Sequence, residues 1–208
     1  MSSKREQQVD FNRYHLLPRE ESRLISGWFN RSLQKLGCHK EEAFDAFISA
    51  WVAFNGWAAC VTQISEPDCE IIKRLKQDEI ICQDFEKLLA SQNSEFSHSV
   101  AEFAKFWPIF KVQDLRTHHI TLDCTQSSRQ EIVSNYLAKR IKRYWPQCWT
   151  SDRGAAITWP NTLDTLYRVR CNLFHGEKAL SCEMDQEIVS SAFHTLAYFL
   201  KEAKYLDH

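Results

Sequence analysis

Apolar residues recur at helical spacing through most of the chain, with polar residues filling the positions between them. The clearest case is the segment from about Lys40 to Val61, which is apolar on nearly every face. A helix of that kind is expected at the centre of a bundle. The same criterion predicts further helices over residues 18–37, 66–91 (one or two helices), 95–107, 128–144, 162–175 and 185–205.

Three segments lack this helical period. Residues 1–15 are polar and are expected to be loosely ordered, residues 109–126 are predicted to form a loop or a short extended piece, and residues 147–160 a connector. Pro18 suits the start of the first long helix, and Gly37 suits a position just past its end. An apolar stripe on that helix is expected to face the core: Leu24, Ile25, Trp28, Phe29 and Leu33. Asn161 is the expected N-cap of the helix over 162–175.

These elements predict one all-α domain spanning residues 1–208. The chain contains only five glycines and five prolines, which favours helices over a turn-rich β fold. A chain of 208 residues is long enough to bury a sizeable core. No internal repeat and no long linker divides it.

Charge and cysteine content narrow the class of protein. The formal net charge of −1 argues against a general nucleic-acid coat, so any RNA contact must be local. The eight cysteines include no Cys-x2-Cys pair, which favours reduced thiols in a cytoplasmic protein. The N-terminus lacks the apolar core of a signal peptide, and no apolar run approaches the length of a membrane span.

The most informative segment is Arg-Cys-Asn-Leu-Phe-His-Gly-Glu-Lys at residues 170–178. The guanidinium of Arg170 can donate two parallel hydrogen bonds to a phosphate. Histidine can accept and donate a proton near neutral pH without a metal, so His175 is a candidate acid or base. Asn172 lies three residues before His175 and can orient imidazole or phosphate. A phosphodiester with an adjacent hydroxyl suits this set.

This segment resembles the HEPN domain family, an all-helical family with an Arg-x4-6-His motif near the end of its penultimate core helix. It is most similar to the subgroup with Arg-Asn-Asn-Leu-Phe-His-Gly-Gly-Lys. Residues 47–55, Phe-Ile-Ser-Ala-Trp-Val-Ala-Phe-Asn, are similar to the Trp-x-Ala-x-Asn helix of that subgroup. The resemblance covers about a third of the chain. It implies a HEPN-like antiparallel helical bundle, here with extra N-terminal and mid-chain helices.

The resemblance also implies a function. Such a protein would be a homodimer that cleaves RNA without a metal or other cofactor at a site between its subunits. The products would carry a 2′,3′-cyclic phosphate and a 5′-hydroxyl. Arg170, His175 and Asn172 would form the catalytic set. Asn55 would hold these catalytic residues in position. A toxin or phage-defence role, with an antitoxin or regulatory protein as partner, comes from the resemblance alone. Members silenced by tyrosine modification carry Tyr where this chain has Glu177.

Each of these residues also has a structural interpretation. His175 can cap the negative end of the helix dipole, and Arg170 can pair with a carboxylate on a neighbouring helix. Asn172 can cap a loop, and Asn55 can be a core amide. Cys171 departs from the polar residue usual after the motif Arg in catalytic members. It favours the alternative of a non-catalytic HEPN module that binds RNA, a nucleotide or a protein. A scaffold without a polar site is the third alternative.

Two other groups of residues suggest binding. Lys139, Arg140, Lys142 and Arg143 are followed by Tyr144 and Trp145, a pattern that suits the phosphates and bases of single-stranded RNA. A solvated helix face is the commoner origin of such a run. His118, His119 and Cys124 lack the paired spacing of a zinc site, and no metal is expected.

Overall fold

The computed structural model describes residues 9–37, 39–64, 67–91, 94–117, 133, 143–176, 178, 180 and 182–207. In this part of the chain, 70% of the residues are helical and 4% lie in strands, so the predicted all-α class is confirmed. The elements are α1 (Asn12–His15), α2 (Arg19–Leu33), the 3-10 turn η1 (Lys40–Glu42), α3 (Ala43–Thr62), α4 (Asp68–Lys76), α5 (Glu79–Ala90), α6 (Glu95–Ala104), β1 (Ile109–Phe110), α7 (Val112–Thr117), β2 (Tyr144–Trp145), α9 (Trp159–Phe174) and α10 (Glu183–Ala203).

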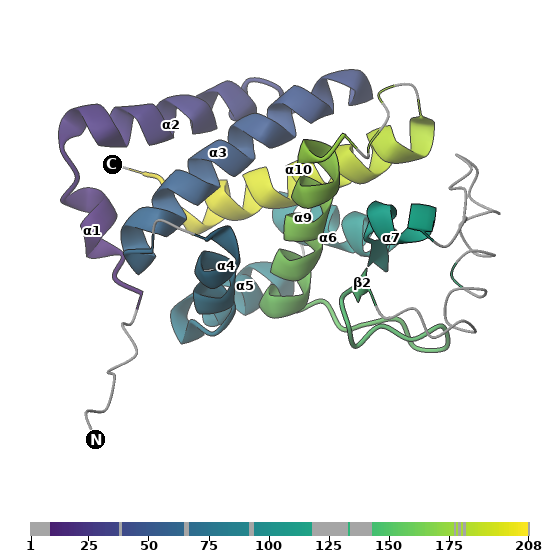
Figure 1. Cartoon of the computed structure of the whole chain (residues 1–208). Coiled ribbons are helices and arrows are strands. Elements are labelled where there is room, and N and C mark those ends of the chain that lie inside the picture. The colour runs from purple at the N-terminus through teal and green to yellow at the C-terminus, as the bar shows by residue number, and fades with distance from the viewer. Residues whose placement is uncertain are drawn as a thin grey trace.

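Helix α3 lies at the centre of the bundle, as its apolar sequence predicts. It packs between α2 and α10, and α9 crosses them at a steep angle while α4 and α5 lie below (Figure 1). By length and composition the stretch Lys40–Thr62 is able to cross a membrane, but 61% of its apolar window is buried inside the fold. This stretch is longer than any membrane-spanning run expected from the sequence. Its burial is typical of the core helix of a soluble protein.

Helix α2 packs on α3 through a different stripe from the one predicted. Ile25 and Phe29 face inward, but Leu24 is 68% exposed and Trp28 is 39% exposed. Ile25 approaches α3 at Gly56, where a Cβ would lie only 3.1 Å from the Ile25 side chain. The side of α2 that carries Ile25 and Phe29 therefore packs against α3. The prediction that Leu24 and Trp28 are core residues is therefore wrong.

The N-terminal segment is more ordered than predicted over its described residues. Tyr14 is fully buried, Val9 is 6% exposed, and the Asp10 amide donates to the Val61 carbonyl at 2.9 Å. An isolated four-residue helix has little stability of its own, so α1 forms because it packs against α3. Residues 1–8 lie outside the described residues.

The middle of the chain differs most from prediction. β1 pairs antiparallel with β2, joining Ile109 to Trp145 and Phe110 to Tyr144. The extended piece predicted within 109–126 is thus found, but Val112–Thr117 forms a helix that the sequence did not predict. Tyr144 lies in a strand rather than at the end of the predicted helix over 128–144, most of which lies outside the described residues. The strands β1 and β2 are far apart in the sequence, so the pattern of residues within either segment does not predict that they pair.

The segment 66–91 forms two helices, one of the two predicted outcomes. Asp78 separates them, and its side chain accepts a hydrogen bond from the Ile81 amide at 3.0 Å to cap α5. None of the described cysteines forms a disulfide with another described cysteine.

Candidate functional site

Helix α9, which carries the motif, begins earlier than predicted. Its N-cap is Thr158, whose hydroxyl accepts from the Asn161 amide at 3.4 Å, so the assignment of Asn161 as N-cap is wrong. The helix begins at Trp159, which is held in the core. Its side chain is 2% exposed, and its indole donates a hydrogen bond to the Leu75 carbonyl at 2.8 Å. This contact fixes the start of α9 against α4.

His175 ends the motif helix and faces solvent. As the C-cap residue it keeps a near-helical backbone (φ −90°, ψ 9°), and its amide donates to the Cys171 carbonyl at 3.1 Å. Gly176 then adopts φ +66°, a left-handed conformation that favours glycine and ends the helix. Among the described residues the imidazole has no hydrogen-bond or ion-pair partner. An exposed, unengaged imidazole is available to a substrate.

Arg170 is held by neighbours on two sides. Its guanidinium pairs with Asp68 of α4 at 2.7 Å, and it lies 4.6 Å from the centre of the Phe174 ring. Its side chain is 23% exposed. The structural interpretation of Arg170, a carboxylate partner on a neighbouring helix, is therefore present in this chain. Its Nε atom is buried and has no hydrogen-bond partner among the described residues.

Arg170 and His175 do not converge within one chain. Five residues along an α-helix turn by about 140° and rise by about 7.5 Å, and His175 stays on the helical path. Phe174, which lies against Arg170, is itself 52% exposed, and Leu180 beyond it is 61% exposed. The end of α9 therefore presents an exposed imidazole beside uncovered apolar side chains.

Asn172 lies in the interior rather than beside the imidazole. It is 1% exposed, and its amide nitrogen donates to the Phe110 carbonyl of β1 at 2.8 Å, which joins α9 to the small sheet. Its Oδ1 atom is buried without a partner in the described residues. The predicted role of orienting imidazole or phosphate gains no support from this position.

Replacing Asn172 by alanine should lower the free energy of unfolding by about 1–3 kcal/mol, because the buried Phe110 carbonyl loses this donor. Denaturant unfolding of both proteins measures the loss. If Asn172 serves only packing, the rate of any RNA cleavage per folded molecule stays within a factor of about two. A rate loss of about 100-fold in fully folded protein would instead assign it to catalysis.

Unsatisfied polar atoms gather near the ring of Tyr167 on α9. Trp51 stacks on this ring at 6.0 Å, Arg170 lies 5.9 Å from it, and Asn55 lies one helical turn after Trp51. The Trp51 Nε1, Asn55 Oδ1 and Arg170 Nε atoms are buried without hydrogen-bond partners among the described residues. Unpaired buried polar groups are rare in folded proteins and suit a site that takes a further ligand or water. Asn55 shares a face of α3 with Trp51, whose ring contacts Tyr167 of the motif helix.

Tyr167 and Cys171 are neighbours on the same face of α9. Burial, followed by the adjacent Cys171 thiol, raises the pKa of Tyr167 to about 12. The tyrosine hydroxyl therefore stays protonated at neutral pH and can donate a hydrogen bond but cannot act as a base. Cys171 is 9% exposed, so the departure from the usual motif residue is covered by protein rather than presented to a substrate.

The predicted basic run is described only at its end. Lys139, Arg140 and Lys142 lie outside the described residues, as do His118, His119, Cys124 and Glu177. Arg143 pairs with Asp114 at 3.3 Å. Trp145 continues from it toward α9, where the guanidinium of Arg168 stacks on the indole ring at 3.7 Å. The aromatic end of the run therefore contacts the motif helix.

A pocket of about 280 Å³ opens at this contact, and the sequence analysis missed it. It is lined by side chains of α4, β2 and α9: Cys69, Ile72, Lys73, Lys76, Gln77, Trp145, Asp164, Tyr167 and Arg168. In the sequence, Asp164 and Arg168 stand four residues apart, a spacing that favours an ion pair within the helix. In the structure Asp164 instead binds Lys76 at 2.5 Å, which joins α9 to α4.

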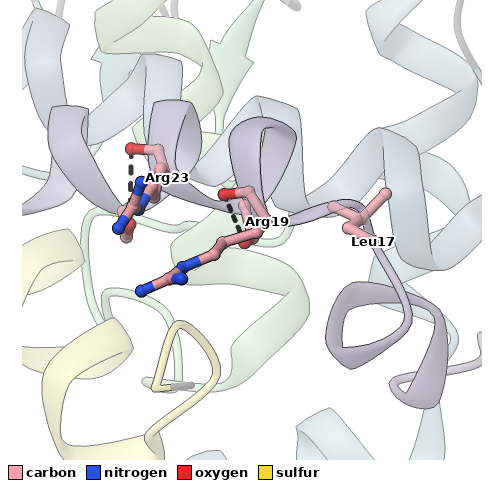
Figure 2. A pocket seen from close by; sticks show the side chains of 5 residues that line it. Leu17, Arg19 and Arg23 are labelled. Atoms are coloured by element: carbon pink, nitrogen blue, oxygen red, sulfur yellow. Dashed lines mark hydrogen bonds between the residues drawn. The ribbon is translucent and has the colours of Figure 1, made fainter.

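A second pocket of about 380 Å³ lies along the exposed side of α2 (Figure 2). Arg19 and Arg23 project into it, with Leu17 at one end. The hydroxyls of Ser22 and Ser26 donate back to the carbonyls of Arg19 and Arg23 at 3.2 and 3.4 Å. Those hydroxyl protons are thus engaged by the helix itself. The pocket lies on the side of the fold formed by α2, away from the motif.

Among the described residues no three His, Cys, Asp or Glu side chains gather as a metal-ligand set. A scan against models of known protein families, a search of curated proteins and a search of solved structures returned no match to this chain.

Proposed function

We propose that this protein is a metal-independent endoribonuclease of HEPN type that acts as a homodimer. The observation that carries the proposal is the exposed, unengaged His175 at the end of the helix that also holds Arg170. The unsatisfied Nε atom of Arg170 and the unsatisfied Oδ1 atom of Asn55 add support, because both suit a site completed by another molecule.

Arg170 and His175 point in different directions within one chain, and a dimer is able to bring them together. When two copies of α9 pack across a two-fold axis, His175 of one protomer can approach Arg170 of the other. Phe174 and Leu180 are large exposed apolar side chains that such an interface is able to bury. A homodimer that covers these side chains creates one cleft lined by groups from both chains.

The chemistry in that cleft follows from the two side chains. His175 accepts the proton of a ribose 2′-hydroxyl as the O2′–P bond forms and the P–O5′ bond breaks. The imidazolium of the second protomer's His175 donates a proton to the departing O5′ atom. Arg170 stabilises the charge that develops on the phosphate. The products are a 2′,3′-cyclic phosphate and a 5′-hydroxyl, and no cofactor takes part.

The test is incubation of a mixed RNA pool with the full-length protein in EDTA, followed by end-group analysis. We expect cyclic-phosphate and 5′-hydroxyl ends from the wild type and none from an identically purified His175→Ala protein. Equal cleavage by both proteins would identify a contaminating nuclease. Light scattering on the same samples should give a dimer, and a strict monomer at micromolar concentration would contradict the composite cleft.

A non-catalytic HEPN module that binds RNA, a nucleotide or a protein is the second candidate. The specific observation in its favour is the Arg170–Asp68 ion pair, which engages the guanidinium within its own chain. RNA binding without cleavage, in the presence or absence of EDTA, would support this candidate. A toxin or defence role for either candidate would have to be tested in cells, for example by growth arrest on expression.

A further inference from the structure

The pocket between α4, β2 and α9 differs in charge from the chain as a whole. Three cationic side chains line it, Lys73, Lys76 and Arg168, against the single carboxylate of Asp164. With Glu70, the 3.9 Å partner of Lys73, also counted, one positive charge remains in excess, on a chain with a formal net charge of −1. The local excess favours an anionic ligand.

The lysines differ in how firmly they are held. Lys76 is 29% exposed and bound to Asp164 at 2.5 Å, so its position is fixed by the α4–α9 contact. Lys73 is 67% exposed and reaches only a loose contact of 3.9 Å with Glu70. Lys73 is therefore the cation with most freedom to meet a ligand, and Lys76 forms part of the pocket wall.

The pocket also offers a stacking surface. The Arg168 guanidinium lies over the Trp145 ring, with its central carbon 3.7 Å from the ring centre. Nucleobases stack on aromatic rings and on guanidinium planes. A flat base is therefore able to extend the existing Arg168–Trp145 stack, while a neighbouring phosphate meets the lysines.

The pocket lies on the same side of α9 as the candidate acid or base. His175 follows Arg168 by seven residues, which return a helix to within about 20° and advance it by about 10 Å. Arg170, in contrast, is turned toward Asp68. The α9 side chains between them, Cys171 and Asn172, are buried, so a strand bound in the pocket reaches His175 over the segments that cover these two residues.

We propose that this pocket binds one unpaired nucleotide of a single-stranded RNA, with its base on the Arg168–Trp145 stack and its phosphate at Lys73 and Lys76. A pocket of about 280 Å³ matches the scale of a single nucleotide. The inference rests on the proposed function in that the bound strand continues to His175. It adds to that function a requirement for unpaired RNA and a site for holding it outside the dimer cleft.

Binding is measured separately from cleavage, in full-length protein carrying His175→Ala so that the RNA stays intact. The probe is a fluorescein-labelled 12-nucleotide RNA without secondary structure, followed by fluorescence anisotropy in EDTA. Lys73→Glu and Trp145→Ala should each weaken binding about ten-fold or more. Lys105→Glu is the matched control, because Lys105 is also 67% exposed and pairs with an acid three residues earlier. It should change affinity less than two-fold.

Two further measurements identify the ligand. A duplex of the same sequence should bind at least ten-fold more weakly than the single strand, and a free mononucleotide should compete only at far higher concentration. Equal binding of the duplex, or equal losses for Lys73→Glu and Lys105→Glu, would overturn the inference. If Trp145→Ala unfolds the protein, Lys73→Glu still decides the question, because an exposed lysine carries little of the fold.

The two proposals fail in different ways. RNA cleavage by the wild type together with unaltered RNA affinity in Lys73→Glu would support the nuclease proposal. The same result would show that the pocket is not the RNA-binding site. Loss of affinity in Lys73→Glu without any wild-type cleavage would support the pocket as the RNA site of a non-catalytic module and remove the nuclease proposal.

Discussion

Substituting His175 by alanine is expected to lower the rate of RNA cleavage by about 10²–10⁴-fold, the usual contribution of a general acid or base. The free energy of unfolding should change by no more than about 0.5 kcal/mol, because the imidazole is exposed and makes no contact with another described side chain that the fold needs. Cleavage rates at saturating RNA and denaturant unfolding of the same samples measure the two effects.

The companion variant Arg170→Ala should behave differently. It removes the partner of Asp68, whose side chain is only 22% exposed, so both the cleavage rate and the stability should fall. Parallel loss of rate and stability in His175→Ala would mean that the imidazole serves the fold as a helix cap. That result would favour the scaffold alternative over either functional proposal.

Replacing Trp159 by alanine is expected to destabilise the protein by about 3–5 kcal/mol, a large part of the stability of an ordinary domain. The side chain is 2% exposed, its ring stacks on Phe199 of α10 at 4.7 Å, and its indole donates to Leu75 of α4 at 2.8 Å. Alanine leaves a cavity where these helices meet and removes the donor. Denaturant unfolding followed by circular dichroism measures the loss.

Trp28→Ala is the matched control for this experiment. Trp28 is 39% exposed on α2, and its one ring contact among the described residues is with Arg31, at 5.5 Å, so we expect a loss below about 1 kcal/mol. A similar loss in both variants would contradict the packing described for α2 and α9. Trp159→Phe should fall between them, since it keeps a ring in the core but removes the hydrogen bond.

The arrangement of the motif helix explains why the two functional candidates are close competitors. Arg170 is engaged by Asp68 in its own chain, whereas His175 is free of such contacts in the described residues. A carboxylate partner holds a guanidinium in place and does not remove its charge, and the other terminal nitrogen of Arg170 can still face a phosphate. The ion pair is therefore compatible with a positioned catalytic arginine as well as with a structural one.

The long helices and their order could be predicted from the sequence because a helical period is a local property, whereas the short helices α1 and α7 could not. Alternation of apolar and polar residues every three to four positions locates α2, α3, α6, α9 and α10 without knowledge of their partners. The same local information identified α3 as the central helix. It also put Arg170 and His175 near the end of α9, since glycine after a run of helix formers marks a terminus.

Tertiary structure alone decided which side chains meet. Leu24 and Ile25 are both apolar neighbours on α2, and only the close approach to Gly56 determines which of them is buried. Asn172 meets a carbonyl 62 positions earlier, and Arg168 meets an indole brought to it by the pairing of β1 with β2. Such contacts depend on how distant segments pack, and the energy of packing is shared over many residues rather than written in any one spacing. The helices of this protein are thus set by its local sequence, whereas its pocket and the partner of Arg170 exist only because the helices pack together.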